Sequence, residues 1–166
     1  MHCLRHMIFI CTLLCPLSVL AAGVPETRFF TQDASDYTLA AEVLKDSGLD
    51  AALAAARSAV LEAERLRESS PDLAFGLAKR AMFHCIYAWM LIQKPGQPVM
   101  PEQNGQAREL LGSLRAFFDW DKPSLDRIAA KTGDLLQEVI TAREAREIVM
   151  QGIDPKEAAA AKALEK

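Results

Sequence analysis

Apolar residues recur three or four positions apart along most of the chain, and no window shows the apolar–polar alternation of a half-buried strand. The pattern predicts helices over residues 35–46, with Ser35 or Asp36 as the cap, and over 49–68, separated by the helix-ending pair Ser47-Gly48. A third helix, over 71–93, follows Ser70-Pro71-Asp72. That start combines a capping hydroxyl, a proline and an acid in the first turn.

The third predicted helix is the most apolar part of the chain after its N-terminus. From Ala81 to Ile92 it is apolar on all sides apart from His84 and the hydroxyl of Tyr87. A helix that is apolar all round is normally buried among other helices. We therefore expect this helix at the centre of a bundle, with Trp89 in the core, where replacement by alanine would cost about 3–5 kcal/mol.

The second half of the chain continues the helical pattern. A loop with three prolines over 94–103 precedes an amphipathic stripe from Ala107 to Phe118. Ser124 is expected to cap the next helix, and the capping-box pattern from Thr141 to Glu144 to start another. Asp154 begins an alanine-rich terminal helix. The predicted fold is an all-α, up-and-down bundle of five to six helices.

The first 22 residues form a separate unit. One arginine, an apolar stretch of about 14 residues and small residues before Gly23 are typical of a secretory signal peptide. The predicted organisation is a signal peptide over 1–22, an extended lead-in over 23–34 and one helical domain over 35–166. The protein is then exported. The alternatives are a misplaced start codon, with a cytoplasmic chain beginning near Val24, and an uncleaved anchor.

Composition and charge exclude several classes of protein. The 166 residues carry a net charge of −3, which becomes −4 once Arg5 leaves with the leader, whereas proteins that coat nucleic acid need a basic surplus. After the leader, Cys85 is the one remaining cysteine, so an internal disulfide is excluded. No stretch beyond the leader predicts a transmembrane span.

The chemistry-bearing residues are few. His84 and Cys85 are adjacent, so on a helix they point about 100° apart and form neither a metal site nor a nucleophilic pair. Phosphate-loop, dinucleotide and nucleophile-elbow motifs are absent, and we expect no cofactor and no metal. Glu144 and Glu147 beside Arg143 are expected to be solvated ion-pair partners. Phe117, Phe118 and Trp120 are expected to pack in the core, with a binding patch as the alternative.

The segment from Ala78 to Ala88, with the sequence AKRAMFHCIYA, resembles the central helix of HEPN domains (higher eukaryotes and prokaryotes nucleotide-binding). Members of that family often have Arg-Ala-Tyr-Tyr-Ala-Met-Phe-His-Ala-Ala there. An acid-rich helix before it, a proline-containing loop and a Leu/Phe helix after it also follow the family's order. The resemblance covers roughly residues 49–150 and implies a helical bundle with a binding role.

The resemblance does not extend to the family's ribonucleases, in which four to six residues separate an arginine from a histidine. Three residues separate Arg80 from His84, and Lys79, with the four-residue spacing, is not arginine. We therefore predict a non-catalytic module that binds a nucleotide, RNA or a protein, through Lys79, Arg80, His84 and Tyr87, with a protein partner or a homodimer favoured by charge. His84 is not expected to be a catalytic base. The alternatives are an exported helical protein of the cell envelope acting through protein contacts, and a divergent ribonuclease.

Overall fold

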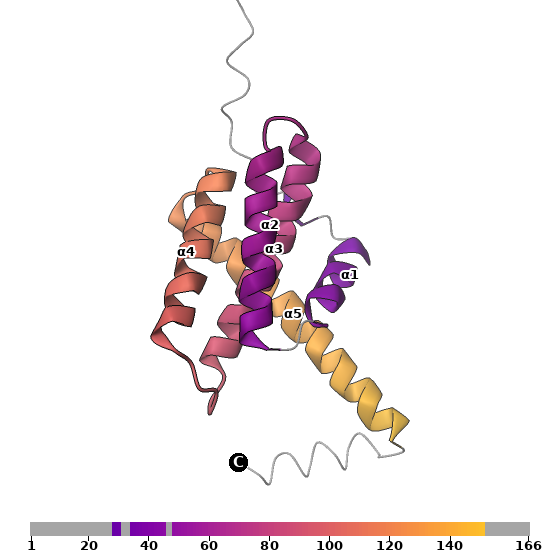
Figure 1. Cartoon of the computed structure of the whole chain (residues 1–166). Coiled ribbons are helices and arrows are strands. Elements are labelled where there is room, and N and C mark those ends of the chain that lie inside the picture. The colour runs from indigo at the N-terminus through magenta and orange to yellow at the C-terminus, as the bar shows by residue number, and fades with distance from the viewer. Residues whose placement is uncertain (1–27, 31–33, 46–47, 152–166) are drawn as a thin grey trace, which may run out of the picture.

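The computed structural model describes residues 28–30, 34–45 and 48–151, and within them every regular element is a helix. The five helices are α1 (Ala34–Val43), α2 (Leu49–Leu66), α3 (Pro71–Gln93), α4 (Pro101–Phe118) and α5 (Lys122–Met150) (Figure 1). The all-α prediction is confirmed. The predicted leader and the predicted helix from Asp154 lie outside the described residues.

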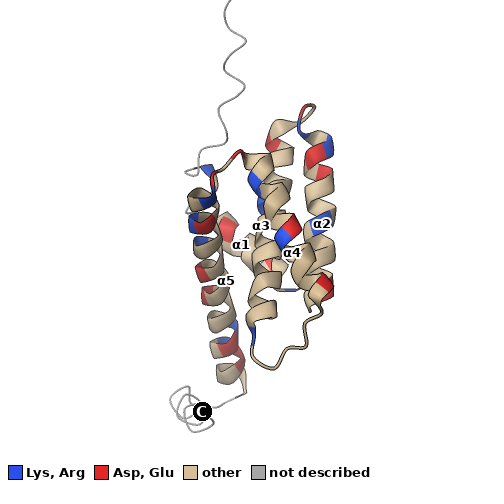
Figure 2. Cartoon of the chain, turned by 90° about the vertical axis from the view of Figure 1, so that its left-hand side faces the viewer, with Lys and Arg blue, Asp and Glu red and all other residues tan. Residues whose placement is uncertain are grey.

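Helix α3 is the centre of the bundle, because it contacts each of the other four helices. α2 and α3 pack side by side along their lengths, α4 lies against both, and α5 crosses the bundle obliquely and extends beyond it (Figures 1 and 2). These contacts agree with the apolar stretch of α3, which has no polar face to turn toward water. None of the helices in the described parts of the chain is both long enough and apolar enough to cross a membrane.

Small side chains let α2 and α3 approach each other closely. Alanines recur along both helices and are almost completely buried, and small side chains of this kind allow two helix backbones to lie close together. The buried alanines are Ala52, Ala56, Ala59 and Ala63 on α2 and Ala74, Ala78, Ala81 and Ala88 on α3.

An aromatic cluster fills one end of the bundle. Phe118, at the end of α4, stacks on Trp120 with ring centroids 4.2 Å apart, and Phe83 of α3 lies within the same cluster. At its centre is Phe29, which is fully buried. This residue falls in the segment assigned to the lead-in, so part of that segment contributes to the core.

Helix α5 corrects two local predictions. It runs without a break through Thr141, whose hydroxyl donates to the carbonyl of Gln137 at 2.9 Å instead of capping a new helix. Its N-cap is Asp121, whose carboxylate accepts from the Ser124 backbone N–H at 2.8 Å, so the aspartate replaces the predicted serine cap. Hydrogen bonding from the Ser124 side chain, and then from its backbone N–H, lowers the pKa of Asp121.

The structure also corrects the predicted start of α4, the burial of Trp89 and the role of Asp36. α4 begins at Pro101, inside the predicted loop, because proline is accommodated in the first turn of a helix. Trp89 packs against the core but is only partly buried. We therefore expect Trp89→Ala to lower the free energy of unfolding by less than the roughly 3–5 kcal/mol typical of a fully buried aromatic residue. Asp36 is a buried residue within α1 and not its cap.

Candidate functional site

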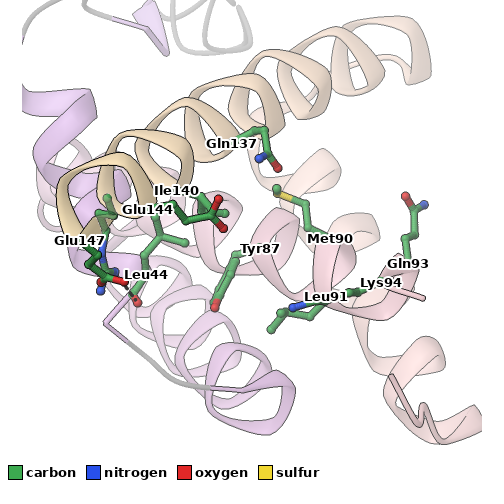
Figure 3. Close-up of a pocket in the computed structure, with 11 residues that line it drawn as sticks. Leu44, Tyr87, Met90, Leu91, Gln93, Lys94, Gln137, Ile140, Glu144 and Glu147 are labelled. Atoms are coloured by element: carbon green, nitrogen blue, oxygen red, sulfur yellow. Dashed lines mark hydrogen bonds between the residues drawn. The ribbon is translucent and has the colours of Figure 1, made fainter. Parts of the chain in front are cut away.

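A groove of about 600 Å³ lies between the C-terminal half of α3, the distal half of α5 and the residue after α1 (Figure 3). Apolar side chains and one tyrosine line its middle, whereas charged side chains lie toward its two ends. The apolar and aromatic lining residues are Leu44, Tyr87, Met90, Leu91 and Ile140, and the polar ones are Gln93, Lys94, Gln137, Arg143, Glu144 and Glu147.

The continuity of α5 builds one wall of the groove. Gln137, Ile140, Glu144 and Glu147 are three or four residues apart, which places them on one face of an uninterrupted helix. The Arg143 guanidinium donates to the carbonyl of Leu44 at 3.2 Å. This bond satisfies a carbonyl just past the end of α1, where the helix supplies no donor, and joins that end to α5.

Tyr87 is the one predicted site residue that lines the groove. Lys79 and Arg80 instead connect α3 to α1. Lys79 pairs with Asp36 in a buried ion pair, and Arg80 pairs with Glu42 at 2.6 Å on the surface. Two of the four predicted residues, Lys79 and Arg80, are therefore engaged in ion pairs with α1 and do not line the groove.

His84 and Cys85 both lie inside the bundle. His84 is only 5% exposed and is not part of the groove lining. Cys85 is fully buried, and its thiol donates to the carbonyl of Ala107 at 3.5 Å. Burial raises the pKa of Cys85 to about 12, so the thiol stays protonated at neutral pH and is not a nucleophilic thiolate.

Metal ligands do not gather anywhere in the part of the chain that the structure describes. No three side chains of His, Cys, Asp or Glu are placed there to hold an ion. The groove brings together apolar surface, two carboxylates, two basic groups and a phenol. This arrangement is suited to binding an amphipathic surface.

Comparison with known proteins gives no relative: no family model, no curated protein and no solved structure matches this chain. The HEPN resemblance therefore rests on the motif in α3 and the order of the helices, and remains a prediction.

Most of the residues that line the groove were not predicted as site residues from the sequence. Arg143, Glu144 and Glu147 were assigned to solvated ion pairs, and a helix break was expected at Thr141. A signal was present on α3, where Tyr87, Met90 and Leu91 add apolar surface beyond one helix face. That signal identifies a groove only when the length and direction of α5 are known.

Proposed function

We propose that this protein is a non-catalytic, HEPN-like helical binding module whose groove between α3 and α5 takes a segment of a protein partner. The observation that carries the proposal is the groove itself, with an apolar middle and charged side chains of both signs at its margins (Figure 3). Lys94 lies at the α3 end, and Glu147 lies at the other end, where Arg143 also lines the groove. Such a surface fits an amphipathic peptide.

The charges favour a protein over a nucleotide or RNA. A phosphate site needs uncommitted basic groups, but Lys79 and Arg80 form ion pairs with α1. At the groove, Lys94 and Arg143 are matched by two glutamates, and Arg143 donates to the Leu44 carbonyl. The whole chain is acidic, with a net charge of −3, which opposes the approach of a polyanion.

The charges at the groove indicate the chemistry of a matching partner. We infer an amphipathic helical segment with an apolar face that covers Tyr87, Leu91 and Ile140. An acidic residue near one end would meet Lys94, and a basic residue near the other would meet Glu147. The apolar contacts would supply most of the affinity, and the charges would fix the direction of the segment.

The leader-like N-terminus supports a second candidate, an exported protein of the cell envelope that acts through protein contacts. Fractionation of the native source followed by N-terminal sequencing distinguishes the two. A chain that starts near Gly23 in an envelope fraction favours export, and an intact cytoplasmic chain favours a cytoplasmic module.

The groove can be tested by selecting helical peptides from a displayed library against the full chain. We expect selected peptides to share an apolar face with an acid at one end and a base at the other. Ile140→Asp should weaken their binding by about tenfold or more, since it places a charge in the apolar middle. Lys94→Glu, a surface change that leaves the core intact, should weaken peptides that carry the acid.

Leu61→Asp is the matched control, because Leu61 is an exposed leucine on α2 outside the groove. It should leave the affinity unchanged. Peptides that bind Ile140→Asp and Lys94→Glu as tightly as the original chain would refute the groove as the site. Cleavage of RNA by the purified chain, abolished in both His84→Gln and Arg80→Ala, would instead support the ribonuclease alternative.

A further inference from the structure

Residues 28–30 and α1 pack on the rest of the bundle much as a bound ligand would. α1 contacts α3 and α5 far more than α2, its neighbour in sequence. The charged contacts of the segment also reach distant residues: Arg28 pairs with Asp72, Asp36 with Lys79, and Glu42 with Arg80. The segment is therefore held on the bundle mainly by contacts of its side chains with α3 and α5, and less by the covalent link to α2.

Phe29 is the anchor of this segment. It occupies a socket whose walls come from α3, from the end of α4 and from Trp120. The Phe83 ring lies parallel to it at 6.3 Å, and Phe118 and Trp120 approach edge-on at 5.8 and 5.5 Å. A fully buried aromatic side chain surrounded by aromatic walls is typical of an interface hot spot.

Charges around the socket match the segment in order. Arg28, just before the anchor, meets Asp72 and lies over the Phe75 ring at 4.8 Å. Beyond the anchor, the acids of α1 meet bases of α3, first Asp36 with Lys79 and then Glu42 with Arg80. Along the segment, a basic residue is followed by the aromatic anchor and then by two acidic residues. The surface of the bundle offers an acid, the socket and two bases in the matching order.

We propose that this socket is an exchangeable docking site, filled in each chain by its own Phe29 and able to accept Phe29 and α1 from a second copy. A second copy supplies the same anchor and the same charges in the same order, so exchange creates no unpaired group. This site is distinct from the groove, and the proposal does not depend on the proposed function. Leu44 lines the groove directly after α1, so exchange would also change a groove wall.

The test uses the full chain with Asp36→Asn and Glu42→Gln together, which weakens the chain's own segment and leaves the socket unchanged. The probe is a fluorescent peptide of residues 26–45 with the original sequence. We expect it to bind the double variant about tenfold or more tightly than the original chain, in which the internal segment competes for the socket. Fluorescence anisotropy measures both affinities.

A peptide carrying Phe29→Ala is the matched control and should bind the double variant about tenfold or more weakly than the original peptide. The full chain with Phe29→Ala, whose socket is empty, is the second acceptor and should also bind the original peptide. Equal binding of the two peptides, or binding to neither variant while both remain helical by circular dichroism, would overturn the proposal. Loss of helical structure in both variants would overturn it too, because the segment would then be an inseparable part of the core.

Discussion

Phe118→Ala is expected to lower the free energy of unfolding by about 3–5 kcal/mol, as for other large-to-small changes of a buried aromatic residue. Phe118 is fully buried at the end of α4. Its ring stacks on Trp120 at 4.2 Å and meets Phe29 and Phe75 edge-on at 5.8 and 5.9 Å. Truncation removes all of these contacts at once and leaves a cavity between α3 and α4.

Phe117→Ala is the matched control, because the adjacent ring has the same size and a different environment. Phe117 is only partly buried, and the Arg67 guanidinium lies over its ring at 5.2 Å. Its truncation should cost about 1 kcal/mol. Urea denaturation followed by circular dichroism measures both changes, and similar losses would show that the aromatic cluster is not packed around Phe118.

The helices themselves could be predicted because their signals are local. The start at Pro71 and the apolar stretch that follows define α3, and its central position follows from the lack of a polar face. Leu49 to Leu66 likewise keeps a helical stripe with few interruptions. These patterns need no knowledge of the rest of the fold.

The course of α5 could not be predicted from the same kind of signal. Thr141 and Glu144 match a capping box, but the same residue types are tolerated inside a helix when the threonine hydroxyl bonds to the preceding turn, as it does to Gln137. The surrounding residues, including Ala142 and Ala145, favour helix, so the helix continues. One wall of the groove depends on this outcome.

The roles of Phe29 and Asp36 are set by residues far away in the sequence. Phe29 lies in a short segment without periodicity, and its burial depends on Phe83, Phe118 and Trp120. Asp36 fits a cap by position, but Lys79, 43 residues later, determines its environment. Contacts between residues so far apart in the sequence cannot be predicted from the local pattern of apolar and polar residues.

The N-terminal segment joins the two surfaces that matter for the proposals. Phe29 closes the aromatic socket at one end of the segment, and Leu44 lines the groove at the other. The Arg143 bond to the Leu44 carbonyl fixes that second end to α5. A change that displaces α1 is therefore expected to alter the groove as well as the socket.

Asp36→Ala is expected to destabilise the fold by about 3–5 kcal/mol, because it leaves the Lys79 ammonium buried without its carboxylate. Both side chains of this pair are nearly inaccessible, 11% exposed for Lys79 and 5% for Asp36. The Lys79 ammonium also lies 5.6 Å from the centre of the Phe29 ring, in surroundings that give it little hydration. Urea denaturation of the purified chain measures the change.

The Arg80–Glu42 pair supplies the matched control, since it joins the same two helices on the surface, with side chains 48% and 41% exposed. Glu42→Ala should cost no more than about 1 kcal/mol, because water screens an exposed pair. The double change Asp36→Leu with Lys79→Met should recover most of the stability lost in Asp36→Ala, because an apolar pair of similar volume carries no desolvation penalty. Equal losses for Asp36→Ala and Glu42→Ala, with no recovery in the double change, would show that the Asp36–Lys79 pair is hydrated and does not hold α1 on α3.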